Sequence, residues 1–200
     1  MDRRSKMDMK TFIEIGTCDF DTNLPLIESG EWKGIMCEPA PIYFGSLKKK
    51  AESIANYENL ILENIAISDY NGKVDFAVAR NNLASDKSWQ RGISSIIGDH
   101  HTGERLFDIE GNKNLIAETI EVPCLTLDDL IHKHKVESID YLKIDAEGHE
   151  MNIIDAYSWN IKPTFIKLEH MHIDDIYMAT LLQDKGYIVY TEQRDIYAIR

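Results

Sequence analysis

The chain alternates between short apolar runs and segments with helical periodicity, and this alternation constrains its fold more than any other feature. Segments typical of strands lie at 11–15, 34–37, 60–67, 139–144 and 164–168, and a hairpin-like pair lies at 187–191 and 196–199. Between them, apolar residues recur every three or four positions, as at Tyr43, Leu47 and Ala51. Strands that alternate with helices are typical of a parallel sheet covered on both faces. We therefore predict an α/β fold whose ligand binds at the carboxyl ends of the strands.

Length and charge set the broad class of protein. The chain has 200 residues, 44% of them hydrophobic, which is enough for one compact domain. We expect this domain to span 11–200, after an N-terminal extension at 1–10. A net charge of −12, with no basic run longer than 48–50, makes nucleic acid a poor partner. The composition leaves the oligomeric state open.

Other features indicate the cellular setting. No window approaches the roughly 18 apolar residues of a membrane span, and the segment 1–10 lacks the apolar stretch of an export signal. Three widely spaced cysteines predict reduced, structural thiols. We therefore expect a cytoplasmic protein.

The stretch YLKIDAEGHEMNII, at 141–154, gathers charge where an apolar run stops and a helical pattern begins. Such residues can hold or move a proton, and the candidate catalytic side chains are Lys143, Asp145, Glu147 and His149. A helix amino terminus also favours carboxylates through its dipole, which alone would account for Glu147 and Glu150. It does not account for Lys143.

The other strand ends carry further candidates. FIEIGTCDFDTN, at 12–23, places Glu14 and Gly16 where a strand turns toward a helix. GIMCEPAP, at 34–41, ends the second strand with Glu38, a position from which an acidic residue commonly binds ribose hydroxyls. The alternatives are a simple tight turn at Gly16 and a solvated loop carboxylate at Glu38. No G-x-G-x-x-G and no G-x-x-x-x-G-K-[ST] is present, which counts against dinucleotide and P-loop sites.

The segments FIEIGT, CEPAP, NIAISD, RGISSI, LTLDDL and IDYLKIDAEGHEMNII together resemble the FkbM family of S-adenosylmethionine-dependent methyltransferases, from Thr11 to Glu169. The resemblance implies a Rossmann-like class I methyltransferase fold: a mostly parallel seven-stranded sheet, helices on both faces and a C-terminal antiparallel hairpin. It also implies methyl transfer, most often to a hydroxyl of a sugar or natural-product-like small molecule, a small-molecule or glycan acceptor that the sequence does not specify further. The cofactor residues that it implies are Glu14, Gly16, Thr17, Glu38, Pro39, Ala66, Ile67, Ser68 and Asp145.

One position departs from the family pattern. The family usually has a second glycine four places after the first, where this chain has Phe20. A phenylalanine cannot replace a glycine whose backbone touches a ligand. We therefore expect the turn, or the placement of the cofactor, to differ here.

Two routes would activate an acceptor hydroxyl. Asp145, Glu147 or His149 would act as a general base, or Asp145, Glu169 and His170 would hold a divalent cation. We favour the metal-free route because His170 is an unusual ligand for a hard, oxygen-preferring ion. The residues Glu169 and His170, with Ser94 and Ser95 of RGISSI, are also substrate candidates.

The segment 80–118 is polar and long, which is typical of a lid or substrate-binding insert. Two other function classes remain open: a catalytically inactive Rossmann-like binding domain, and a nucleotide-dependent oxidoreductase, which would normally need the missing glycine triplet.

Overall fold

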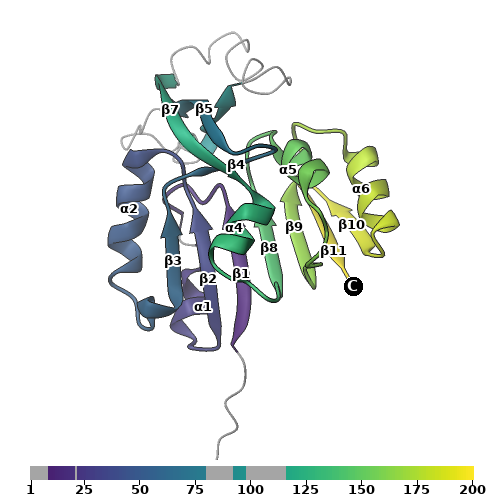
Figure 1. The fold of residues 1–200 in the computed structure, drawn as a ribbon, viewed down its shortest axis with the longest axis horizontal. Helices are drawn as coiled ribbons and strands as arrows, with labels where there is room; N and C mark the ends of the chain where they lie inside the picture. The colour runs from purple at the N-terminus through teal and green to yellow at the C-terminus, as the bar shows by residue number, and fades with distance from the viewer. Residues whose placement is uncertain (1–8, 21, 80–91, 98–115) are drawn as a thin grey trace, which may run out of the picture.

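The computed structural model describes residues 9–20, 22–79, 92–97 and 116–200. Its main sheet has seven strands in the order β10-β11-β9-β8-β1-β2-β3 (Figure 1). The five strands from β9 to β3 in this order are parallel, and β11 runs antiparallel to both β9 and β10. The strands are β1 (Lys10–Ile15), β2 (Trp32–Cys37), β3 (Leu60–Glu63), β8 (Tyr141–Ile144), β9 (Phe165–Glu169), β10 (Ile188–Glu192) and β11 (Asp195–Ile199). The predicted α/β fold with its C-terminal hairpin is confirmed.

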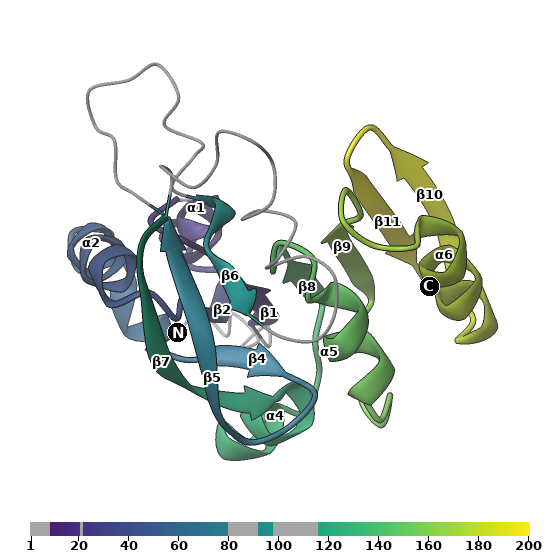
Figure 2. The same cartoon turned by 90° about the horizontal axis from the view of Figure 1, so that it is seen from above.

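Helices cover both faces of this sheet (Figures 1 and 2). Helices α4, α5 and α6 pack on one face, while α1 and α2 pack on the other. The helices are α1 (Leu24–Glu28), α2 (Pro41–Ala51), the 3-10 helix η1 (Tyr57–Asn59), α4 (Leu127–Lys133), α5 (Glu150–Ala156) and α6 (Asp175–Asp184). No helix in the described ranges is long and apolar enough to cross a membrane.

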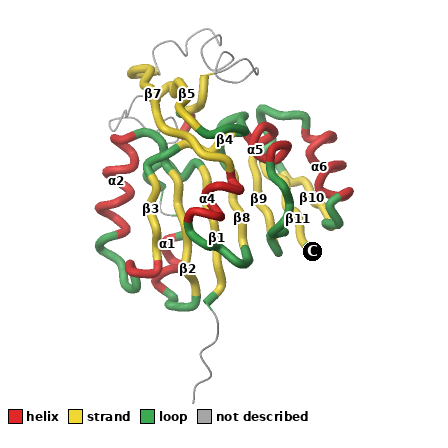
Figure 3. Tube along the Cα trace, viewed as in Figure 1, coloured by secondary structure: helices red, strands yellow, loops and turns green. Residues whose placement is uncertain are grey.

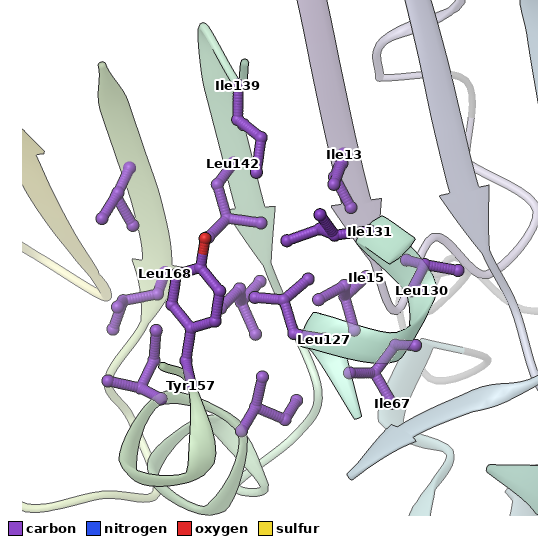
Figure 4. Close-up of a cluster of buried hydrophobic side chains, with 14 of the residues drawn as sticks. Ile13, Ile15, Ile67, Leu127, Leu130, Ile131, Ile139, Leu142, Tyr157 and Leu168 are labelled. Carbon is purple, nitrogen blue, oxygen red and sulfur yellow. The ribbon is translucent and has the colours of Figure 1, made fainter. Parts of the chain in front are cut away.

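The largest core lies between the sheet and α4, α5 and α6. Figure 4 shows Leu127, Leu130 and Ile131 of α4 against Ile13 and Ile15 of β1. Strand residues alternate between faces, so the odd-numbered side chains of β1 enter this core. The even-numbered side chains of β1 point to the opposite face, and one of them is the acidic residue Glu14.

Three helix ends follow local sequence rules. The Thr126 side chain accepts a hydrogen bond from the backbone N–H of Asp129 at the start of α4, and Asp174 does the same for Tyr177 at the start of α6. Helix α6 ends just before Gly186, and that glycine has a φ of +95°. Cys18, Cys37 and Cys124 are buried and form no disulfide with one another, as expected of structural thiols.

A second, four-stranded sheet was not predicted. Its order is β4-β7-β5-β6, and it lies at the end of the main sheet to which the arrowheads of β2 and β3 point (Figures 1 and 3). Its strands are β4 (Ala66–Ser68), β5 (Gly72–Ala79), β6 (Ser95–Ile97) and β7 (Ile116–Thr126). Residues 92–97, which include strand β6, and the start of β7 fall inside the candidate lid at 80–118, and the remainder, 80–91 and 98–115, lies outside the described residues.

The prediction of one strand at 60–67 was wrong. The run divides at Asn64, whose side-chain amide donates hydrogen bonds to the carbonyl oxygens of Glu38 and Pro39, at 2.8 and 3.0 Å. Strand β3 therefore ends in the main sheet at Glu63, and the chain enters the second sheet at Ala66. The polar pair Glu63 and Asn64 interrupts the apolar run, and this was the sequence signal that the strand divides here.

Core packing predicts where truncation is costly. Leu142 on β8 is fully buried, so Leu142→Ala should lower the free energy of unfolding by about 2–5 kcal/mol. Ile188 on the edge strand is 77% exposed, and Ile188→Ala should change it by less than about 0.5 kcal/mol. Urea unfolding monitored by circular dichroism checks both, and equal effects of the two truncations would contradict the assigned core.

Candidate functional site

A cavity lies at the carboxyl ends of β1, β2 and β8, against the second sheet. Residues of the main sheet and its loops form one side, and residues of β4, β5 and β6 form the other. The lining residues are Ile15, Gly16, Cys18, Glu38, Pro39, Tyr43, Ile65, Ala66, Ile67, Phe76, Gly92, Ser94, Ile96, Asp145 and Ala146. This is the sheet edge at which α/β folds bind ligands.

The turn after β1 requires a glycine at position 16. Gly16 has a φ of +78°, and a Cβ placed there would lie 1.8 Å from the carbonyl oxygen of Asp145. The backbone N–H groups of Gly16 and Thr17 donate to the carbonyl oxygen of Cys37, at 3.1 and 3.2 Å. The turn is therefore fixed between the ends of β2 and β8, and it leaves bare backbone facing the cavity.

Glu38 follows β2 and holds two loops. Its Oε2 accepts a hydrogen bond from the N–H of Cys18 at 2.6 Å, and its Oε1 accepts one from Ala40 at 2.7 Å. The side chain is buried, and this burial raises its pKa to about 7, although the two backbone donors act in the opposite direction. Each carboxylate oxygen keeps a second lone pair, which a ligand hydroxyl is able to use.

Glu14 does not line the cavity, although it was predicted among the cofactor residues. Its Oε1 accepts hydrogen bonds from Lys143 Nζ at 2.7 Å and from Thr22 Oγ1 at 2.6 Å, and its Oε2 accepts one from Asn23 Nδ2 at 2.8 Å. The carboxylate is fully buried. Glu14 therefore links the loop after Gly16, through Thr22 and Asn23, to Lys143 in the sheet.

Lys143 is the partner of this buried acid. Glu14 and Lys143 are register partners on β1 and β8, which places their side chains on one face. Burial by itself would lower the pKa of Lys143, but the carboxylates of Glu14 and Asp145 outweigh it and raise that pKa, so the ammonium stays charged. Its Nζ also lies 3.8 Å from Asp145 Oδ2. Lys143 is thus an ion-pair residue that reaches the rim of the site.

Asp145 ends β8 and lines the cavity, as predicted. Burial raises its pKa above the usual carboxylate range, while Lys143 partly offsets this effect. A carboxylate with a raised pKa at the edge of a cavity is suited to accept a proton.

His149 lies beside the second sheet. Its Nε2 is 2.9 Å from the hydroxyl oxygen of Ser68, and that hydroxyl donates to Asp69 Oδ1 at 3.0 Å. With the hydroxyl proton so directed, the imidazole N–H donates to Ser68. This contact joins the turn after β8 to β4.

Glu150 shapes the turn between β8 and α5. Its side chain is almost completely buried, and it accepts hydrogen bonds from the backbone N–H groups of Ala146 at 2.7 Å and Gly148 at 2.8 Å. Burial raises its pKa to about 8 against the effect of these donors. The acid is therefore explained by specific hydrogen bonds as well as by the helix terminus.

Three further side chains converge beside Asp145. One ligand atom from each of Glu147, Glu169 and His172 lies within 4.8 Å of the others. Burial raises the pKa of Glu147 to about 9, with the carboxylate of Glu169 as the next cause. Burial and Asp145 raise the pKa of Glu169 to about 7. Among the described residues this is the set that meets; it contains neither Asp145 nor His170, which the sequence had grouped with Glu169.

The predicted cofactor and substrate residues divide into two groups. Those at the cavity are Gly16, Glu38, Pro39, Ala66, Ile67, Ser94 and Asp145. Those outside its lining are Glu14, Thr17, Ser68, Ser95, Glu169 and His170. Sequence reasoning missed the lining residues Cys18, Tyr43, Phe76, Gly92 and Ile96, because most of them depend on the unpredicted sheet; Tyr43, for example, donates from its hydroxyl to Ala79 O of β5 at 2.6 Å.

Phe20 packs in the cluster of buried residues beside the second sheet, not in the cavity lining. A Cβ on Gly92 would lie 3.0 Å from its ring. In this turn Cys18 takes a φ of +54°, and the N–H of Phe20 donates to Thr17 O at 3.3 Å.

The buried pair beneath the site predicts a stability effect. Lys143→Met leaves Glu14 buried without its cation, so the free energy of unfolding should fall by about 3–5 kcal/mol. Adding Glu14→Gln should recover at least about 0.5 kcal/mol, because it removes the uncompensated charge. The control is Lys48→Met, which breaks an exposed pair with Glu52 and should cost about 0.5 kcal/mol or less. Strictly additive losses in denaturant titrations would contradict the coupling.

Comparisons with known proteins identify the family of the chain. The methyltransferase FkbM domain family matches residues 14–189. The chain is similar to the precorrin-6y C5,15-methyltransferase of Geobacter metallireducens GS-15, with 16% identity, a TM-score of 0.49, and coverage of 97% of this chain and 82% of that one. It is also similar to the human methyltransferase 10 domain containing protein, with 10% identity, a TM-score of 0.49, and coverage of 99% and 73%. No match was found among curated protein sequences. Because the family match spans most of its length, the chain belongs to the FkbM methyltransferase family.

Proposed function

We propose that the protein is an S-adenosylmethionine-dependent methyltransferase that methylates a hydroxyl oxygen of a sugar or natural-product-like small molecule. The observation that carries the proposal is the cavity in which Gly16, Glu38 and Asp145 meet at the carboxyl ends of three adjacent strands. Membership of the FkbM family supports the reaction class.

The residues around the cavity fit this cofactor. Ala66 and Ile67 of β4 and Phe76 of β5 supply apolar walls suited to the adenine ring. Glu38 is placed to accept hydrogen bonds from ribose hydroxyls. Gly16 lines the cavity without a side chain, so the methionine portion is able to approach the backbone of this turn closely. The hydroxyl oxygen of Thr17, buried without a partner in the described structure, adds a polar group at the same turn.

The bound cofactor supplies an electrophilic methyl carbon on a sulfonium, so the chain's own task is to orient the acceptor and take its proton. Asp145 is the base in this proposal. Its carboxylate lies at the cavity and has a raised pKa, and Lys143 stands 3.8 Å away to limit that rise. Lys143 in turn is fixed by Glu14, which makes these two positioning residues.

Two other readings are distinguishable. An inactive binding domain would bind S-adenosylmethionine weakly or not at all, or would bind it without turnover. A nucleotide-dependent oxidoreductase would bind a nicotinamide nucleotide instead, although the glycine triplet is missing. Transfer of a labelled methyl group, screened across sugars, glycolipids and small hydroxylated metabolites, separates these readings and identifies the acceptor.

Glu38→Ala should weaken S-adenosylmethionine binding, since it removes the acceptor for two ribose hydroxyls. Each lost hydrogen bond to the charged group should cost up to about 1.5–3 kcal/mol. Isothermal titration calorimetry measures this loss, with a thermal melt to verify folding, because Glu38 also holds Cys18 and Ala40. Glu58→Ala, at an exposed site, is the control. Parental affinity in a folded Glu38→Ala protein would refute the ribose assignment.

Asp145→Asn should lower methyl transfer by about 10²–10⁴-fold, because it removes the proton acceptor. In the parent, kcat/KM should rise with pH as Asp145 loses its proton, above the ordinary carboxylate pKa of about 4, since burial raises its pKa. The variant should lose this rise. Asp184→Asn, at the exposed end of α6, should keep both the rate and the profile. An Asp145→Asn enzyme with an unchanged pH profile would exclude Asp145 as the base.

A further inference from the structure

The turn after β8 holds a carboxylate in an unusual backbone conformation. Glu147 has a φ of +51°, a region that residues with a side chain rarely adopt, and Gly148 follows with a φ of +98°. Glu150 accepts hydrogen bonds from Ala146 and Gly148, the residues on either side of Glu147. Strained backbone that neighbouring groups hold in place is typical of functional sites. The turn therefore presents the Glu147 side chain in one direction.

The carboxyl group of Glu147 lies close to that of Glu169. Glu169 ends β9, and one of its oxygens lies within 4.8 Å of a Glu147 oxygen and of a His172 ring nitrogen. The Nε2 of His172 is 3.7 Å from Glu147 Oε2. The Oε2 atom of Glu169 is buried and accepts no hydrogen bond in the described structure. Two carboxylates this close repel each other unless one of them takes up a proton or a positive charge lies between them.

The nearby lysines are engaged elsewhere. Lys143 pairs with Glu14 at 2.7 Å, and Lys167 pairs with Asp195 at 2.9 Å. Within the described residues, neither Glu147 nor Glu169 forms a salt bridge with a lysine or an arginine. The positive charge of Arg194 partly offsets the rise in pKa of both Glu147 and Glu169. The corner therefore gathers two carboxyl groups and one imidazole within reach of a single ion.

We propose that Glu147, Glu169 and His172 bind a divalent cation at the carboxyl ends of β8 and β9. Two carboxylate oxygens and one imidazole nitrogen suit a borderline ion such as Mn²⁺ better than Ca²⁺, which takes oxygen ligands. The set differs from the one that the sequence suggested, because Glu147 replaces Asp145 and His172 replaces His170. The sequence alone ranked activation of the acceptor hydroxyl by a cation second. The proposed ligand set gives that cation a defined binding site.

The role of this ion rests on the proposed function, since the site lies two residues from Asp145. An acceptor hydroxyl bound to the ion has a lowered pKa. Its proton passes to the Asp145 carboxylate, its oxygen forms a bond to the methyl carbon, and the carbon–sulfur bond breaks with both electrons going to sulfur. The products are the methyl ether and S-adenosylhomocysteine, so charge and atoms balance.

Mn²⁺ binding to the full chain, without cofactor or acceptor, tests the site directly. Electron paramagnetic resonance counts free Mn²⁺ during a titration, and we expect one bound ion per chain. Glu169→Gln and His172→Gln should each weaken Mn²⁺ binding by at least about tenfold, because each removes a ligand. Glu58→Gln and His132→Gln, matched changes at exposed positions, should leave it unchanged.

Thermal melts keep the test independent of folding and of the proposed reaction. Mn²⁺ should raise the melting temperature of the parent and of both controls, and raise it less in the two site variants. Absence of Mn²⁺ binding by the folded parent, or binding unaltered in folded Glu169→Gln and His172→Gln proteins, would overturn the proposal. Calorimetry with S-adenosylmethionine is run separately. Absence of cofactor binding would reject the proposed function but not the ion site. Cofactor binding without Mn²⁺ binding would reject the ion site but not the proposed function.

Discussion

The buried ion pair between Glu14 and Lys143 is the interaction on which the rest of the site depends. It joins β1 to β8 at the centre of the sheet, and through Thr22 and Asn23 it also fixes the loop that follows Gly16. A buried pair of this kind is stable only when its remaining donors and acceptors are satisfied, and here Glu14 has three donors. The position of the cavity therefore follows from charge placed inside the sheet as much as from the turn above it.

Sequence patterns were sufficient for the main sheet because each of its strands is a compact apolar run. They failed for the second sheet, in which β4 and β6 have three residues each and pair with strands distant in the sequence. Short strands carry too little periodicity to be recognised, and their pairing is a property of the folded chain. The lining residues that come from that sheet were missed for this reason.

The same distinction applies inside the site. Gly16, Glu38 and Asp145 were found because each follows a recognisable strand. The partner of Glu14 was not predictable, because Lys143 lies 129 positions away and is set by the register of β1 against β8. The convergence of Glu147 with His172 depends on a left-handed backbone angle, which residue types other than glycine do not signal.

Glu38 has a consequence for how divergent members of such a family are compared. Its carboxylate accepts hydrogen bonds from Cys18 and Ala40 in the absence of a cofactor, so a lineage that abandons catalysis would still lose these two loop contacts by exchanging it. Asp145, by contrast, contributes its side chain to the cavity and forms no hydrogen bond that shapes the described loops around it. A descendant that has become a pure binding protein is then free to exchange Asp145 while it keeps Glu38. Under the proposed function, the aspartate, not the glutamate, is the position expected to differ between active enzymes and inactive relatives.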